Sequence, residues 1–178
     1  MWGLTSQFRK LGLEINFPYV ITVVCGFLYV LGLVMDPDAI FQSFDLFRFL
    51  SPSGSVTLQM GMTGVVPIML QGHWWTLITA IYLHGGLLHI LFNMMWVRQL
   101  APLVEEFFGP CRLFTIFTAG GVAGFFFSTL MGTSYTLGAS GSIFGLLAAA
   151  IAFGRQQGST LFTRQFMQWA VLLFVMGI

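Results

Sequence analysis

The chain has 178 residues, of which 57% are hydrophobic, 16% aromatic and 7% charged, with a formal net charge of +1. A soluble domain carries about 25% charged residues, so this composition excludes an ordinary solvated surface, and the near-neutral charge argues against a nucleic-acid partner. Lipid accepts only helices or closed barrels, and the sequence has no alternating barrel pattern, so it predicts an all-α polytopic membrane protein.

The first predicted element is a membrane span over residues 17–35. Its apolar run matches the roughly 20 residues that cross a bilayer core. No small-residue cleavage site follows it, so we do not interpret it as a cleavable signal peptide. Residues 1–16 are mixed in charge and are predicted to form a cytoplasmic lead-in. The chain is therefore divided into 1–16 and a transmembrane domain over 17–178.

Residues 36–73 form a long connection that is rich in Gly, Pro and Ser. No charged residue lies between Arg48 and Arg98. An uncharged connection of this length is predicted to lie partly submerged at the outer interface, with short helices and neighbouring protein that satisfies its backbone. Trp74 and Trp75 suit the headgroup level.

Further predicted segments follow in chain order. They are a second span over 86–107, a third over 113–131, a fourth from the turn at 138–141 to about 153, a polar loop over 155–164, and a fifth span that begins near 165 and is incomplete at 178. Small residues recur every four positions on the third and fourth spans, which predicts tight helix contacts there.

The basic residues set the expected orientation. Arg and Lys gather on the cytoplasmic side of helical membrane proteins. Of the 7 basic residues, only Arg48 falls on the other side of the predicted topology. The N-terminus is therefore predicted to be cytoplasmic. Separately, we expect an integral multi-pass protein of a bacterial cell membrane. This topology places Ser140 just below the outer surface.

The turn Gly138-Ala139-Ser140-Gly141 leads into an apolar helix inside a long uncharged region. Backbone N–H groups at a helix start have no intrahelical partner, and together with the helix dipole they can hold an oxyanion beside Ser140. In the alternative interpretation, the serine only caps the helix and the glycines only permit close packing.

A second polar group lies upstream, on the predicted second span. His89 and Asn93 are four residues apart, so they share one helical face. Both side chains can donate hydrogen bonds, and two donors aimed at one point can form an oxyanion hole. His84 lies where the chain enters the helix and need not face the same way.

Three other interpretations of the histidines compete with an oxyanion hole: a structural role, a zinc site and a haem site. A lone histidine is usually structural, and we assign that role to His73 at the interface. For zinc, there is no His-Glu-x-x-His pattern and no carboxylate between Asp45 and Glu105, so no metal site is predicted. A haem would need axial histidines that face each other from different spans.

Taken together, the histidine–asparagine motif and the Gly-Ala-Ser-Gly turn resemble those of the rhomboid intramembrane serine proteases. The likeness runs from about Trp75 to Arg155. It includes Glu105 and Gly109, which match a structural Glu and Gly of that family. The resemblance implies a rhomboid-like bundle of six helices around a water-filled cavity that opens outward, with about five of the six transmembrane helices in this chain.

The resemblance also assigns roles to individual residues. Ser140 is expected to be the nucleophile, and His89 and Asn93 are expected to form the oxyanion hole with the Ser140 backbone N–H. The further residues expected near the site are His84, Gly138 and Gly141. The resemblance implies no metal or cofactor. It implies membrane-spanning protein substrates that are cut near the outer face of the bilayer.

Two features depart from the family pattern. Where the family's loop reads Trp-Arg, this chain has Trp75-Thr76, which predicts weaker anchoring of the loop. The family's catalytic histidine lies on the sixth helix, so the 178-residue chain alone is expected to be inactive. The small-residue row Gly141-Gly145-Ala149 is expected to let that absent helix approach the serine closely.

The sequence thus predicts an intramembrane serine endopeptidase that cleaves transmembrane segments through a Ser-His dyad. The alternative is a catalytically inactive rhomboid-like protein that binds transmembrane segments. A haem or ion-conducting protein is a third interpretation. Substrate identity and oligomeric state are left open.

Overall fold

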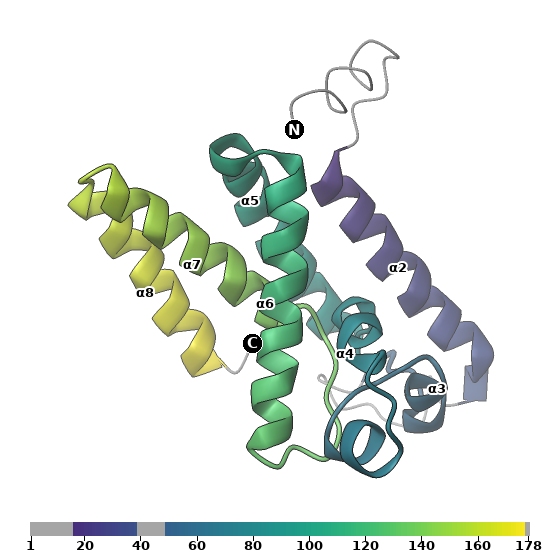
Figure 1. Cartoon of the computed structure of the whole chain (residues 1–178). Helices are drawn as coiled ribbons and strands as arrows, with labels where there is room; N and C mark the ends of the chain where they lie inside the picture. Colours follow the sequence, from purple (N-terminus) through teal and green to yellow (C-terminus); the bar gives the residue numbers. More distant parts are fainter. Residues whose placement is uncertain (1–15, 39–48, 177–178) are drawn as a thin grey trace.

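A computed structural model describes residues 16–38 and 49–176, and within these ranges the protein is helical (Figure 1). The only strand-like feature among them is an isolated bridge between Thr63 and Thr136. The helices are α2 (Phe17–Met35), α3 (Gly54–Gln59), the π-helix η2 (Val66–Leu70), α4 (Thr76–Thr79), the 3-10 helix η3 (Ala80–Tyr82), α5 (Leu87–Phe108), α6 (Pro110–Leu130), α7 (Ser140–Gln156) and α8 (Thr160–Met176). The predicted all-α fold is confirmed.

Three of the described helices, α2, α5 and α6, are long and apolar enough to cross a membrane. Their bounds agree with the first three predicted spans to within about three residues. Local chemistry explains where α2 begins. The side chain of Asn16 accepts a hydrogen bond from the Tyr19 N–H, and Pro18 occupies the first turn, where its missing N–H costs nothing.

The prediction of a polar loop at 155–164 is wrong. Helix α7 continues to Gln156 and α8 begins at Thr160, five residues earlier than expected, so three residues join them. Gly158 makes this turn with a φ of 68°, a conformation that favours glycine. Most of the polar side chains that suggest a loop belong to the end of α7 or the first turns of α8, and only Gln157 and Ser159 lie in the turn itself.

The connection between α2 and α5 contains short helices, as predicted, although its residues 39–48 lie outside the described part of the chain. It contacts the segment that precedes α7 through backbone hydrogen bonds between Thr63 and Thr136. Trp74 and Trp75 are 52% and 51% exposed, and the ring of Trp75 packs against Gly61.

Helices α6 and α7 pack together along their two rows of glycines. A Cβ built on Gly120 would lie 3.0 Å from the Cα of Gly145, and one built on Gly124 would lie 3.1 Å from the Cα of Gly141. The expectation that the small residues of α7 face a helix absent from the chain is not met at these positions. They face α6, because two matched rows of small residues let these backbones meet.

Aromatic side chains attach α8 to the rest of the bundle. The rings of Phe107 on α5 and Phe153 on α7 stack with centroids 4.0 Å apart, and Phe162 of α8 lies edge-on to Phe107 at 5.9 Å. Trp169 of α8 contacts Trp96 of α5 edge to face at 5.5 Å. These contacts hold α5, α7 and α8 together on the side away from α2 (Figure 1).

Candidate active site

Helix α7 begins beside the middle of α6 rather than at its end. Ser140 is its first residue, and the next residue, Gly141, packs against Gly121 and Gly124 of α6. Gly124 precedes the last residue of α6, Leu130, by six positions. At 1.5 Å rise per residue, the start of α7 lies about 9 Å from the end of α6, measured along the α6 axis. Figure 1 shows the connecting loop returning from that end into the body of the protein.

The Ser140 side chain lies at a helix start with free backbone donors. Ile143 is the first residue of this turn whose N–H donates within the helix, to the Ala139 carbonyl oxygen at 3.0 Å. The N–H groups of Ser140 and Gly141 precede that bond and have no intrahelical acceptor. Ser140 is partly exposed. A group with developing negative charge would be stabilised here.

His89 lies directly against this turn. A Cβ built on Gly138 would lie 2.6 Å from the His89 Nε2 atom, so only glycine permits this approach. The φ of Gly138 is 122°, which also favours glycine. The Gly85 N–H donates to Nδ1 of His89 at 3.4 Å. A neutral imidazole that accepts at Nδ1 carries its hydrogen on Nε2, the atom that faces Gly138.

Asn93 lies one turn further along α5 and is completely buried. Its Nδ2 donates to the His89 backbone carbonyl oxygen at 2.8 Å, which turns the side chain toward the start of α5. One N–H of that amide is not used in this bond. The Oδ1 atom is buried without a hydrogen-bond partner in the described structure. His89 and Asn93 thus lie on one helical face, with spare donor capacity on both side chains.

His84 contacts His89 rather than facing away from it. The two rings meet edge to face with centroids 5.2 Å apart. His84 is 2% exposed, and neither of its ring nitrogens has a hydrogen-bond partner among the described residues. His73 is elsewhere, exposed beside the ring of Trp75 at 5.9 Å. Within the described residues, no group of three or more His, Cys, Asp or Glu residues is placed to hold a metal ion.

The prediction of a weakly anchored loop at Trp75-Thr76 is wrong. Thr76 is 2% exposed, and its hydroxyl is hydrogen-bonded to the Thr63 hydroxyl at 3.0 Å and to the His73 carbonyl oxygen at 2.7 Å. Thr79 adds a bond to the Gly61 carbonyl oxygen at 2.9 Å. The short side chain of Thr76 can anchor this loop because the Thr63 hydroxyl lies within hydrogen-bond distance of it.

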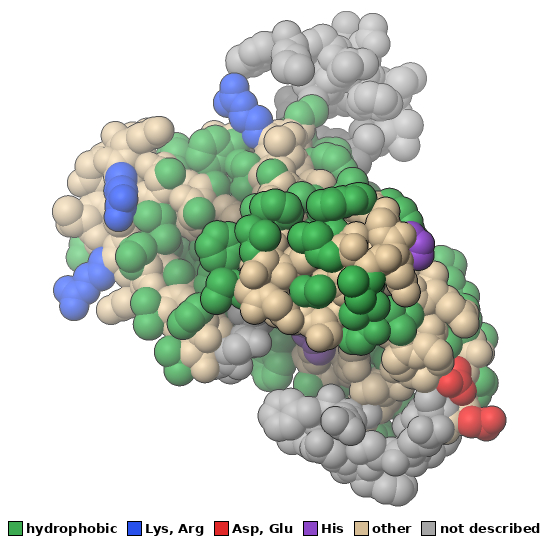
Figure 2. Space-filling view, turned by 60° about the horizontal axis from the view of Figure 1, so that its bottom comes forward, with side chains coloured by type: hydrophobic (Ala, Val, Ile, Leu, Met, Phe, Trp, Pro, Cys, Tyr) green, Lys and Arg blue, Asp and Glu red, His purple; other side chains and the backbone are tan. Residues whose placement is uncertain are grey.

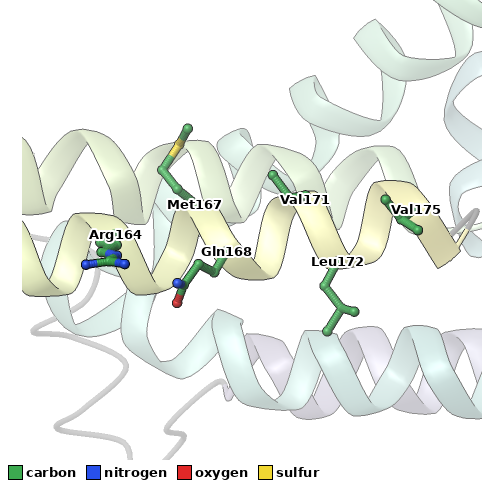
Figure 3. A pocket seen from close by; sticks show the side chains of 6 residues that line it. All are labelled: Arg164, Met167, Gln168, Val171, Leu172 and Val175. Atoms are coloured by element: carbon green, nitrogen blue, oxygen red, sulfur yellow. The ribbon is translucent and has the colours of Figure 1, made fainter.

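Two features of the structure are not predicted from the sequence. Ser142 is completely buried, its hydroxyl has no partner in the described structure, and a Cβ on Gly121 would lie 2.6 Å from its Oγ. A surface hollow of about 450 Å³ lies along α8 (Figure 3). Its lining residues all belong to α8 and none is a candidate site residue: Arg164, Met167, Gln168, Val171, Leu172 and Val175.

Helices long and apolar enough to span a bilayer, with a polar site between them, define an integral multi-pass membrane protein. The family model for the Rhomboid domain matches residues 71–178, so the chain belongs to the rhomboid family. The family resemblance of the His89–Asn93 and Gly138–Gly141 motifs is thereby confirmed.

Curated relatives include proteins of a plant and a bacterium. The chain is 34% identical over 113 residues to RHOMBOID-like protein 7 of Arabidopsis thaliana, covering 63% of this chain and 36% of that protein. It is 38% identical over 106 residues to the putative rhomboid protease YdcA of Bacillus subtilis, covering 55% of this chain and 51% of that protein. It is 37% identical over 84 residues to the rhomboid protease GluP of the same bacterium, covering 47% and 17%. The chain thus spans about half or less of each relative's length.

Proposed function

We propose that the protein is an intramembrane serine endopeptidase in which Ser140 is the nucleophile. The observation that carries the proposal is the contact between His89 Nε2 and Gly138, because it puts an imidazole donor against the turn that presents the serine. Two relatives are named as rhomboid proteases, which supports the same activity. The proposed substrates are transmembrane segments of membrane proteins, cut near the outer face of the bilayer.

In the proposed mechanism, the Ser140 oxygen attacks the scissile carbonyl carbon and its proton passes to a general base. The carbonyl oxygen becomes an oxyanion held by His89, Asn93 and the Ser140 N–H. The base then gives its proton to the leaving amine, which leaves an acyl group on Ser140. Water attacks that ester with the help of the same base, releases the second product and restores the serine hydroxyl.

The proposed base is a histidine on a further helix after α8, as the rhomboid resemblance implies. None of the three histidines of this chain is proposed as the base: His73 lies beside Trp75, and His84 and His89 lie together at the start of α5. A serine without an adjacent base is a weak nucleophile. The 178-residue chain by itself is accordingly proposed to be inactive.

The proposed orientation has a cytoplasmic N-terminus, with residues 1–16 as a cytoplasmic lead-in and 17–178 as the transmembrane domain. In the view of Figure 2, the visible Arg side chains lie on one side of the described molecule and the visible acidic side chains on the opposite side, while Glu105 and Glu106 belong to the end of α5 that leads to Arg112. That asymmetry supports the orientation. A bacterial cell membrane is proposed as the location. Relatives include both Bacillus subtilis proteins and a mitochondrial protein of Arabidopsis thaliana.

The alternative function is a catalytically inactive rhomboid-like protein that binds transmembrane segments. Labelling of the full-length protein with a fluorophosphonate probe separates the two. A protease is expected to react, the Ser140→Ala variant is expected not to, and Ser142→Ala, which changes a buried serine on the same helix, is expected to react like the parent. Equal labelling of the parent and Ser140→Ala would exclude Ser140 as the nucleophile, and no labelling of any form would favour the binding protein.

A further inference from the structure

The loop that precedes Ser140 is paired to the long connection between α2 and α5. Thr63 N–H donates to the Thr136 carbonyl oxygen at 3.0 Å, and Thr136 N–H donates back to the Thr63 carbonyl oxygen at 2.7 Å. Val65 N–H continues the pairing to the Thr133 carbonyl oxygen at 2.9 Å. A Cβ built on Gly64 would collide with the Ser134 carbonyl oxygen, so the two backbones are in close contact.

A buried pair of hydroxyls ties this pairing to α4. Thr63 is completely buried, and its side chain is hydrogen-bonded to that of Thr76, the first residue of α4. Thr76 is also bonded to the His73 carbonyl oxygen, so its position is fixed from two sides. Hydrogen bonds sheltered from water are stronger than exposed ones, and leaving one partner alone is costly.

A second tie joins the same short element to the serine turn. The Gly138 N–H donates to the Ala80 carbonyl oxygen at 2.9 Å, and Ala80 is the first residue of η3, which directly follows α4. The segment of α4 and η3 is therefore linked to the serine loop at two points: indirectly, from Thr76 through Thr63 to Thr136, and directly, by the bond between Ala80 and Gly138. The path from Thr136 to Ser140 is only four residues long, so its two ties determine where the serine turn lies against His89.

We propose that Thr63 and Thr76 are positioning residues for Ser140, acting through their mutual hydrogen bond and the Thr63–Thr136 bridge. This inference rests on the proposed function for its kinetic consequence. Neither side chain touches the reacting atoms. Their effect is to hold the serine turn at the distance from His89 at which both can act on one carbonyl group, and a small displacement of such groups is costly to rate.

The test compares hydroxyl-deleting and hydroxyl-keeping variants of the full-length protein. Thr76→Val and Thr63→Val remove one hydroxyl each at nearly constant shape, and Thr76→Ser keeps it. Thr57→Val is the matched control, because Thr57 is also buried and hydrogen-bonded, but its hydroxyl contacts the Ser53 and Gly54 carbonyl oxygens around its own helix α3. Each variant is assayed for the rate of fluorophosphonate labelling, well below its unfolding temperature.

Thr76→Val and Thr63→Val are each expected to slow labelling about tenfold, the order that loss of one buried hydrogen bond produces. Thr76→Ser is expected to restore the rate, and the double Val variant to be no slower than the slower single variant, since both act through one bond. Labelling of Thr76→Val at the parental rate, or equal slowing by Thr57→Val, would overturn the positioning role.

Amide hydrogen exchange provides a readout that does not depend on activity. Thr76→Val is expected to speed exchange at residues 133–140 relative to the parent, and Thr57→Val is expected not to. If the parent protein is not labelled by the probe, the proposed function fails while this comparison still decides whether the threonines hold the turn. Unchanged exchange at 133–140 in Thr76→Val would overturn the inference even in an active protease.

Discussion

Replacement of Gly138 by alanine tests the contact that the proposed site depends on. The added Cβ would lie 2.6 Å from Nε2 and 2.7 Å from Cε1 of His89, distances at which atoms must move apart. Ordinary contact begins near about 3.5 Å, so the turn and the imidazole must separate by about 1 Å. The φ of 122° adds backbone strain of about 1–3 kcal/mol for any residue with a Cβ.

The two costs are separated by a control at Gly132. That glycine has a φ of 87°, and a Cβ added to it would meet nothing within 4 Å, so Gly132→Ala carries backbone strain without a collision. Both variants are expected to lower the unfolding temperature. Only Gly138→Ala is expected to slow fluorophosphonate labelling and substrate cleavage, by roughly 10²-fold, the order seen when one oxyanion donor is lost. Parental rates in Gly138→Ala, or equal slowing in the two variants, would refute the reasoning.

Two further predictions concern the proposed oxyanion donor Asn93 and helix packing. Asn93→Ala is expected to lower the turnover number roughly 10²-fold, and an unchanged turnover number in a cleavage assay would remove Asn93 from the site. Gly120→Ala is expected to destabilise the protein by about 1–3 kcal/mol, because its Cβ would lie 3.0 Å from the Gly145 Cα atom. Thermal unfolding measures this loss, with Gly26→Ala on α2 as the open-space control, and equal unfolding temperatures for the two variants would contradict the packing argument.

The membrane class, the all-α fold and the first three spans could be predicted from the sequence because each depends on a local property. An apolar run of bilayer length is a helix wherever it packs. The proximity of Gly138 to His89 is expected only through the family resemblance. No local rule brings together two residues from different spans, so the contact itself had to come from the structure.

The errors share one physical origin, which is that a pattern identifies a face but not its partner. The spacing of Gly141 and Gly145 predicts a tight helix contact without naming α6 as the neighbour. Thr76 stands where the family pattern has Arg, which suggests that an anchor of the loop is lost. The sequence does not show that Thr63 lies within hydrogen-bond distance of Thr76. The polarity near Arg155 suggests a loop, although it belongs to the end of α7.

The most direct measurement of the central claim is the position of the covalent adduct after the full-length protein reacts with a fluorophosphonate. Mass spectrometry of the digested protein is expected to find the adduct on Ser140, and to find no adduct after prior unfolding, because reactivity requires the assembled site. An adduct on another serine, or one on Ser140 that forms equally in the unfolded protein, would contradict the account.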